Sequence, residues 1–257
     1  MLVYTFDQTM DGVLSAVFDA YFRHQQPDML MGEGEPLPLF CEEVYKVITT
    51  EEKASRVWAG LEKHVSKEAL RLLMVSWLSE DKALSTPLFH YIYKVFGTKG
   101  IERNFSDPDV LFVTNTARRV MHEQLKMKQF IRFQKAKDGT YLAVISPDNN
   151  VLPLITDHFQ DRFGDQPWLI YDAKRRYGYY YDGKSSVIRI TFQDEDALPF
   201  SLDNGKLNDD LLSENDKLMQ DLWRTYFKAI CIKERMNPKK QLSDMPRRYW
   251  RYMTEKQ

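Results

Sequence analysis

Residues 130–146, FIRFQKAKDGTYLAVIS, decide the fold class of this chain. Two runs of alternating apolar side chains flank the dipeptide Asp138-Gly139, which favours a tight turn between antiparallel strands. After it, the spacing predicts a helix over residues 151–163 and then three more strands. These strands are expected at Trp168–Asp172, Tyr177–Tyr181 and Val187–Phe192.

The chain before this stretch has mainly helical spacing of apolar residues. A capping box formed by Thr49 and Glu52 is expected to open one helix, and Ser66 to cap the next. Residues 27–38 contain glycines and prolines and are expected to form a loop. Short strands are expected at Leu2–Phe6 and Glu42–Ile48, and helices over residues 11–22, 66–78, 87–96 and 108–128.

This order of elements predicts an α+β fold with a mainly antiparallel central sheet, one helix packed on it, and a last long helix over residues 207–235. We expect a single domain over residues 1–257. Its helical part is expected at 1–128, its sheet part at 129–192, and an acidic loop, long helix and basic aromatic tail at 193–257.

Composition and charge indicate a globular protein of the cytoplasm. Of the 257 residues, 43% are hydrophobic and 28% charged, and the net charge is −1. Acidic residues concentrate between residues 194 and 216, and basic ones from Arg224 onward. This asymmetry is compatible with a nucleic-acid-binding face, and the alternative is that the two segments pair within the chain. Cys41 and Cys231 match no metal or redox spacing. No apolar run reaches the ~20 residues of a membrane helix, so we expect no membrane association and no cofactor.

The tail, residues 234–255, reads ERMNPKKQLSDMPRRYWRYMTE. Basic side chains alternate with aromatic ones, a combination suited to a phosphate backbone and exposed bases. Pro238 and Pro246 exclude one continuous helix. The alternative is that the tail wraps the domain, with its aromatic side chains buried and its arginines solvated. The predicted nucleic-acid contacts of the tail are Arg235, Asn237, Lys239, Lys240, Gln241, Arg247, Arg248, Tyr249 and Trp250.

A second basic group, Lys174, Arg175 and Arg176, lies between two predicted strands. Side chains in such a turn can project freely and contact phosphates. The alternative is an ordinary solvated turn.

His158 and Arg162 are four residues apart in a predicted helix and therefore share a face. They could clamp a phosphate together. His158 and Asp172 are weak candidates for catalysis, since no cysteine, serine or second histidine accompanies them. A structural role for His158 remains open. Carboxylates near the ends of elements could hold Mg²⁺, but no zinc spacing, phosphate-binding glycine loop or dinucleotide fingerprint occurs.

Four further stretches are distinctive: DGVLSAVFDAY at 11–21, HFQDRF at 158–163, WLIYD at 168–172 and RMNPKKQLSDMPRRYW at 235–250. With these four motifs the chain resembles the DUF4130 family. The resemblance implies a role in DNA metabolism or repair, beside a radical-SAM partner protein that carries a helix-hairpin-helix motif. It implies no catalytic residue and no cofactor of this chain.

Two hypotheses and a third possibility follow. The first is an accessory nucleic-acid-binding protein that works with a partner enzyme. The second is a metal-assisted enzyme acting on nucleic acid through Asp172 and His158. The third is a protein-interaction module whose acidic segment, residues 194–216, docks a basic partner.

Overall fold

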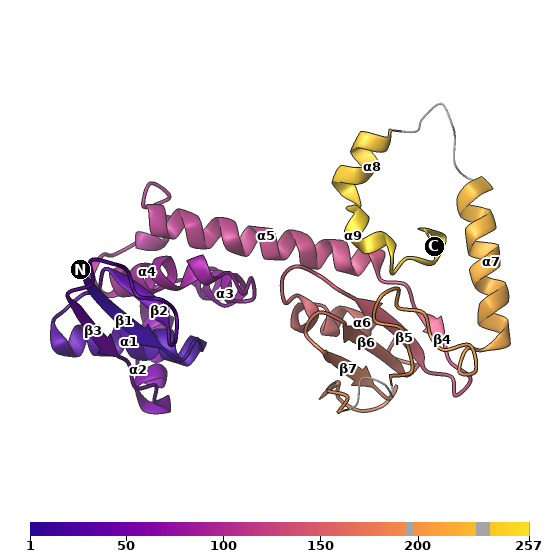
Figure 1. Ribbon diagram of the computed structural model, residues 1–257, viewed down its shortest axis with the longest axis horizontal. Helices are drawn as coiled ribbons and strands as arrows, with labels where there is room; N and C mark the ends of the chain where they lie inside the picture. The colour runs from indigo at the N-terminus through magenta and orange to yellow at the C-terminus, as the bar shows by residue number, and fades with distance from the viewer. Residues whose placement is uncertain (194–197, 230–236, 257) are drawn as a thin grey trace. The chain divides into compact units, whose positions relative to one another are not determined.

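The computed structural model describes residues 1–193, 198–229 and 237–256. The chain forms two compact units, Met1–Met121 and His122–Gln257 (Figure 1). The N-terminal unit is mostly helical and the C-terminal unit is built on a five-stranded sheet, so the predicted α+β class is confirmed. None of the helices within the described ranges is long and apolar enough to cross a membrane.

The N-terminal unit contains a three-stranded parallel sheet in the order β2-β1-β3. Helix α1 (Met10–Arg23) connects the first two strands. The prediction of a loop over residues 27–38 was wrong for residues 29–32, because this segment pairs with β1 and buries Leu30. The strands are β1 (Leu2–Phe6), β2 (Met29–Gly32) and β3 (Glu43–Lys46).

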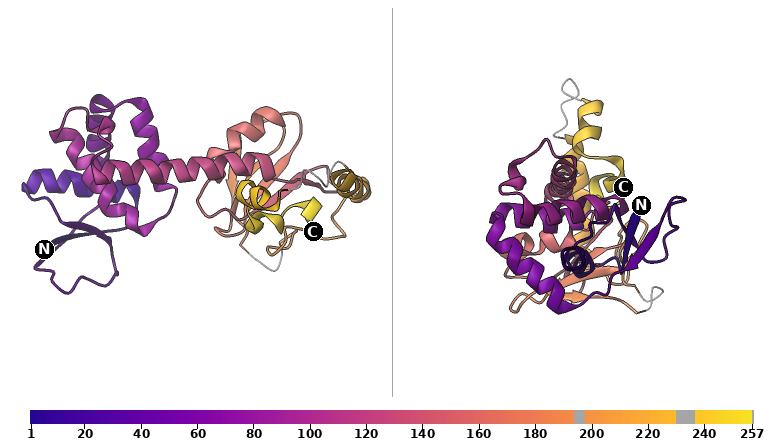
Figure 2. Two further views of the ribbon diagram at one scale, coloured as in Figure 1. Left: turned by 90° about the horizontal axis from the view of Figure 1, so that it is seen from above. Right: turned by 90° about the vertical axis from the view of Figure 1, so that its left-hand side faces the viewer.

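Helices gather on one face of this sheet (Figure 2). Tyr4 and Leu30 point from that face into a core shared with Val17 and Phe89. Ser66 caps a helix as predicted, but the predicted capping residue Thr49 is off by one, because Thr50 accepts the Lys53 amide instead. The remaining helical elements are α2 (Glu51–His64), α3 (Lys67–Trp77), η1 (Lys82–Leu84), α4 (Ser85–Gly97), η2 (Ile101–Arg103) and α5 (Pro108–Phe130).

The sheet of the C-terminal unit is mixed, in the order β4-β5-β6-β7-β8. The predicted hairpin at Asp138-Gly139 is confirmed, with Gly139 at a φ of +93° that favours glycine. Among the described strand pairs of this sheet, only β5 and β6 run parallel, because the chain crosses between them through η3 (Leu152–Leu154) and α6 (Thr156–Arg162). The strands are β4 (Gln134–Lys135), β5 (Tyr141–Ile145), β6 (Trp168–Asp172), β7 (Tyr177–Tyr181) and β8 (Ile188–Ile190).

Both faces of this sheet are covered, so all five residues of β6 are buried. On one face Trp168 meets Phe159 of α6, with ring centroids 6.5 Å apart. On the other, Tyr171 packs against Phe200 at 5.0 Å. This double cover explains why the strand is an unbroken apolar run that ends in one carboxylate, Asp172.

The last part of the chain contains more and shorter helices than predicted. The helix expected from residue 207 begins at Glu214, because Leu207 and Leu212 form bridges to Phe200 and Ala136. Its predicted end at residues 230–235 lies outside the described residues. The elements are α7 (Glu214–Ala229), α8 (Pro238–Asp244), α9 (Arg247–Trp250) and η5 (Thr254–Lys256).

Candidate nucleic-acid interface

The C-terminal segment, residues 237–256, is interrupted at the two predicted prolines. Pro238 occupies the first turn of α8, where the Asn237 side chain caps the helix by accepting the Lys240 amide at 3.0 Å. Pro246 precedes α9. Asn237 therefore has a local structural role, and Arg235 lies outside the described residues.

Tyr249 anchors this segment to the rest of the C-terminal unit. Only 4% of its surface is exposed, and its hydroxyl donates to Oε1 of Glu123 on α5 at 2.7 Å. Arg248 donates both to that hydroxyl, at 2.8 Å, and to Glu123, at 3.2 Å. The predicted alternative of a buried aromatic anchor therefore describes Tyr249 correctly.

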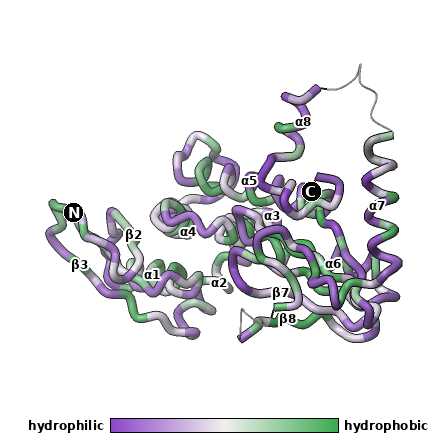
Figure 3. Tube along the Cα trace, turned by 45° about the vertical axis from the view of Figure 1, so that its right-hand side comes forward, coloured by the Kyte–Doolittle hydropathy of each residue, from purple (hydrophilic) through white to green (hydrophobic). Residues whose placement is uncertain are grey.

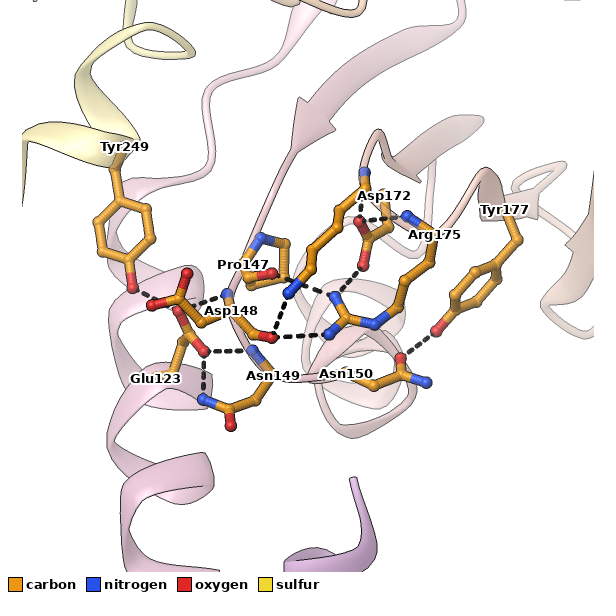
Figure 4. A network of polar contacts seen from close by, with 10 residues as sticks. Glu123, Pro147, Asp148, Asn149, Asn150, Asp172, Arg175, Tyr177 and Tyr249 are labelled. Atoms are coloured by element: carbon orange, nitrogen blue, oxygen red, sulfur yellow. Dashed lines mark hydrogen bonds and ion pairs between the residues drawn. The ribbon is translucent and has the colours of Figure 1, made fainter. Parts of the chain in front are cut away.

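Glu123 is the centre of a polar network that joins three segments (Figure 4). Besides Tyr249, it accepts the amides of Asp148 at 3.0 Å and Asn149 at 2.8 Å, and the Asn149 side chain. Burial alone would raise the pKa of this carboxyl, but hydrogen bonds from Tyr249 and from Asn149 outweigh it and hold the pKa below its ordinary value. An ionised Glu123 thus fixes the loop after β5 and the C-terminal segment on α5.

The outer side of the segment combines cations with an aromatic ring. The guanidinium of Arg247 lies 5.8 Å from the Trp250 ring centre, and the ammonium of Lys256 lies 4.9 Å from it. The Trp250 ring is half-buried and fixed by a hydrogen bond from its Nε1 to the Met245 carbonyl at 3.0 Å. Arg251 is exposed beside the Tyr252 ring, at 4.8 Å.

The other predicted contacts of the tail lie on α8. Lys239 and Lys240 are exposed, and Lys240 pairs with Asp244 at 3.0 Å. Gln241 is half-buried, and its backbone carbonyl accepts the Met245 amide.

The predicted basic turn lies between β6 and β7, but its three cations have different environments. Arg175 does not project freely. Its side chain is 9% exposed and pairs with the fully buried Asp172 at 2.9 Å. It also donates to the carbonyls of Pro147 at 3.1 Å and Asp148 at 2.8 Å. A carboxylate buried at the end of β6 needs a partner cation, which is why Arg175 folds inward.

Lys174 and Arg176 have exposed side chains. The ammonium of Lys174 donates to the Asp148 carbonyl at 2.9 Å. Arg176 has a φ of +59°, which places it in the left-handed region at the end of the turn. Two of the three predicted turn cations are thus open to solvent.

His158 and Arg162 lie on α6, as predicted. His158 is half-buried against Phe159, and its pKa is lowered first by burial and then by the charges of Lys128 and Arg162. Arg162 is exposed. Burial and two neighbouring cations therefore both disfavour the protonated form of His158.

The second candidate pair, His158 and Asp172, is not supported by the surroundings of Asp172. Its carboxylate already accepts the amides of Lys174 and Arg175 and the guanidinium of Arg175. Among the residues described, no three or more His, Cys, Asp or Glu side chains gather into a metal-binding group.

Sequence reasoning missed Glu123 and the loop residues Asp148 and Asn149. Glu123 lies in a long helix among other charged residues and has no motif around it. The only available signal was the turn-forming run Pro147–Asn150, which predicts a loop but not its partners.

Comparison with known proteins places the chain in a family. A family model described as a domain of unknown function, DUF4130, matches residues 82–255. Since this is more than half of the chain, the protein belongs to the DUF4130 family. The matched residues include α6, β6 and the C-terminal segment, whereas the motif at 11–21 precedes them. Neither the curated proteins nor the solved structures contain a match.

Proposed function

We propose that this protein is an accessory nucleic-acid-binding protein of DNA metabolism or repair that works with a partner enzyme. The observation that supports this proposal is the cluster of Arg247, Lys256 and the half-buried Trp250 ring on the C-terminal segment. Tyr249 holds that segment in place through Glu123. Groups that are already ordered lose less conformational entropy on binding.

Different parts of this surface would contact phosphates and bases. Exposed Lys239, Arg247 and Arg251 suit the phosphate backbone, and an unstacked base would stack on the half-buried Trp250 ring by displacing a cation from it. Arg248 has a different role, because it pairs with Glu123 and with Asp148 and so helps to position the segment. A stacking ring favours single-stranded or locally opened nucleic acid.

The test is fluorescence anisotropy of labelled single- and double-stranded DNA at several salt concentrations. Replacing Arg247 and Arg251 together by alanine should weaken binding at low salt and reduce the slope of log K against log salt by about two. The matched control replaces Arg71 and Arg118, two exposed arginines of the N-terminal unit, and should leave the slope unchanged.

Trp250→Ala tests the stacking contact. Loss of one base–aromatic contact of about 1–3 kcal/mol should weaken single-strand binding by about five- to 150-fold. Far-UV circular dichroism should show the same helix content as the parent protein. Absence of DNA binding by the parent protein at low salt would refute the proposed function.

The chemistry of such a complex would belong to the partner. The resemblance to DUF4130 proteins implies a radical-SAM protein with a helix-hairpin-helix motif in that role. The Asp172 carboxylate is buried and paired with Arg175, so it is not available to a metal ion. This pairing supports an accessory role for the chain rather than a metal-dependent catalytic one. Co-expression with such a protein, followed by size-exclusion chromatography, tests the assembly.

Helix α7 favours a second candidate function, a protein-interaction module. The helix alternates between hydrophobic and hydrophilic residues (Figure 3). Acidic side chains lie beside an exposed apolar stripe, and Asp209 and Asp221 are largely exposed. A basic amphipathic helix would match this surface. Leu222→Asp should abolish partner capture and leave DNA binding intact if the two functions are separate. The stripe consists of Leu218, Met219, Leu222, Trp223 and Tyr226.

A further inference from the structure

Strand β3 has one strand neighbour, β1, within the described residues. The Val47 amide donates to the Thr5 carbonyl of β1 at 2.8 Å. Because successive amides of a strand point to opposite sides, the amides of Val44 and Lys46 point away from β1. Within the part of the chain that the structure describes, the outer edge of β3 therefore presents backbone groups that pair with no other strand.

The side chains on one face of this edge are exposed. Val44 is 45% exposed, and the flanking Phe40 and Ile48 are 86% and 65% exposed. Between them stand Glu42 and Lys46, with side chains 85% and 68% exposed. Val44 and Lys46 share one face of β3, and Glu42 directly precedes the strand, so these three residues form a short exposed stripe. Phe40 lies in a turn before the stripe, and Ile48 lies after the end of the strand.

The opposite face of β3 points inward. The Tyr45 ring lies 4.8 Å from that of Tyr4, and its hydroxyl donates to Asp19 of α1. On the outer face, Val44 is nearly half exposed, and the two charged residues make ion pairs within the unit. Lys46 pairs with Glu33 at 3.1 Å, and Glu42 pairs with the Met1 amino group at 2.9 Å. Such exposed ion pairs contribute little to the stability of the fold, so either charged side chain can change its partner at small cost.

The stripe is complementary to itself when its direction is reversed. A two-fold axis perpendicular to a sheet reverses the strand but keeps its faces, and residues directly opposite in an antiparallel pair share a face. An axis through Val44 satisfies both conditions. It places Glu42 opposite Lys46 of the other copy. Each charge then meets its opposite, and the two Val44 side chains meet at the axis.

We propose that two copies of this chain pair antiparallel through the outer edges of their β3 strands, about a two-fold axis at Val44. The two three-stranded sheets become one six-stranded sheet. The two Val44 residues exchange both backbone hydrogen bonds, and each Lys46 amide donates to the Glu42 carbonyl of the other copy. This interface is independent of the nucleic-acid function, because it involves none of the C-terminal residues.

The first test compares Val44→Pro with Val44→Thr by sedimentation equilibrium of the full chain over roughly a hundredfold concentration range. Proline removes the outward amide but none that bonds to β1, so the fold should be retained and the dimer lost. Threonine keeps the amide and should keep the dimer. Circular dichroism and the melting temperature check both folds.

The second test exchanges charges. Lys46→Glu places two like-charged pairs across the axis and should raise the dimer dissociation constant by about tenfold. The double variant Glu42→Lys/Lys46→Glu restores opposite charges and should restore most of the affinity.

A parent protein that stays monomeric at every concentration would overturn the proposal. In that case the exposed Lys46 serves the common purpose of keeping an edge strand from pairing. A dimer that is unaffected by Val44→Pro and by Lys46→Glu would overturn it equally, because the contact would then lie elsewhere.

Discussion

The turn at Lys174–Arg176 and the segment Arg247–Arg251 have similar sequences, each with neighbouring cations beside tyrosines. In the turn, the central arginine is withdrawn from solvent by Asp172 and by two backbone carbonyls. In the segment, Arg247, Arg248 and Arg251 are all exposed, but Arg248 is partly neutralised by Glu123 and Asp148.

The difference lies in the buried acids, not in the basic residues. Asp172 directs one arginine inward, whereas Glu123 is satisfied mainly by Tyr249 and by loop amides. A buried carboxylate costs free energy unless it is paired, so it selects the nearest donor that can reach it. Whether an arginine is structural or available to a ligand therefore depends on acids that are distant in sequence.

The largest effect expected from this comparison is on stability. Arg175→Ala leaves Asp172 buried without its cation and should lower the free energy of unfolding by about 3–5 kcal/mol. Arg176→Ala, the exposed neighbour, should stay within about 0.5 kcal/mol of the parent protein. Urea unfolding followed by circular dichroism measures both. Equal effects would show that Arg175 has no special structural role.

Tyr249→Phe should have the next largest effect. It removes a hydrogen bond to a charged acceptor, Glu123, and should destabilise the docked C-terminal segment by about 1.5–3 kcal/mol. Hydrogen exchange of the amides in α9 measures the opening of this segment. Tyr252→Phe is the matched control. It loses a bond to the neutral Leu202 carbonyl and should cost only about 0.5–1.5 kcal/mol. The reverse order would contradict the anchoring role of Tyr249.

Acid should release the same segment. Hydrogen bonds hold the pKa of Glu123 below the ordinary glutamate value of 4.5 against the effect of burial, and Arg132 does the same for Glu255. A lowered pKa in the folded state means that the stabilisation is complete above pH 4.5 and is lost as the pH falls through the lower value. Limited proteolysis between pH 7 and pH 3 should show cleavage near residues 237–256 only in the acidic range. Cleavage that begins near pH 6 would show that the segment is held by a titratable group other than Glu123 and Glu255.

The smallest expected effect is the change in DNA affinity when the exposed cations of the Lys174–Arg176 turn are removed. Lys174→Ala/Arg176→Ala removes two exposed cations, yet we expect the dissociation constant for DNA to change less than twofold. The C-terminal pair Arg247→Ala/Arg251→Ala should have the larger effect in the same anisotropy assay. A stronger effect of the turn would move the proposed interface to the end of the sheet.

Local patterns predicted much of the fold. Asp138-Gly139 specified a hairpin, Ser66 a helix cap, and Pro238 and Pro246 the breaks of the C-terminal segment. These features depend on backbone angles and on hydrogen bonds within a few residues. The strand at residues 29–32 was not predicted, because its apolar run is short and becomes a strand only by pairing with β1.

The sequence by itself determined the α+β class, the basic and aromatic character of the C-terminal segment and its two breaks, because these follow from periodicity and from the chemistry of proline, glycine and charge. Only the tertiary structure decided which cations are available. Glu123 meets Tyr249 across more than a hundred residues, and the turn at Lys174–Arg176 meets the carbonyls of Pro147 and Asp148. Burial of a charge and the identity of its partner depend on contacts between distant segments, and no local pattern encodes them.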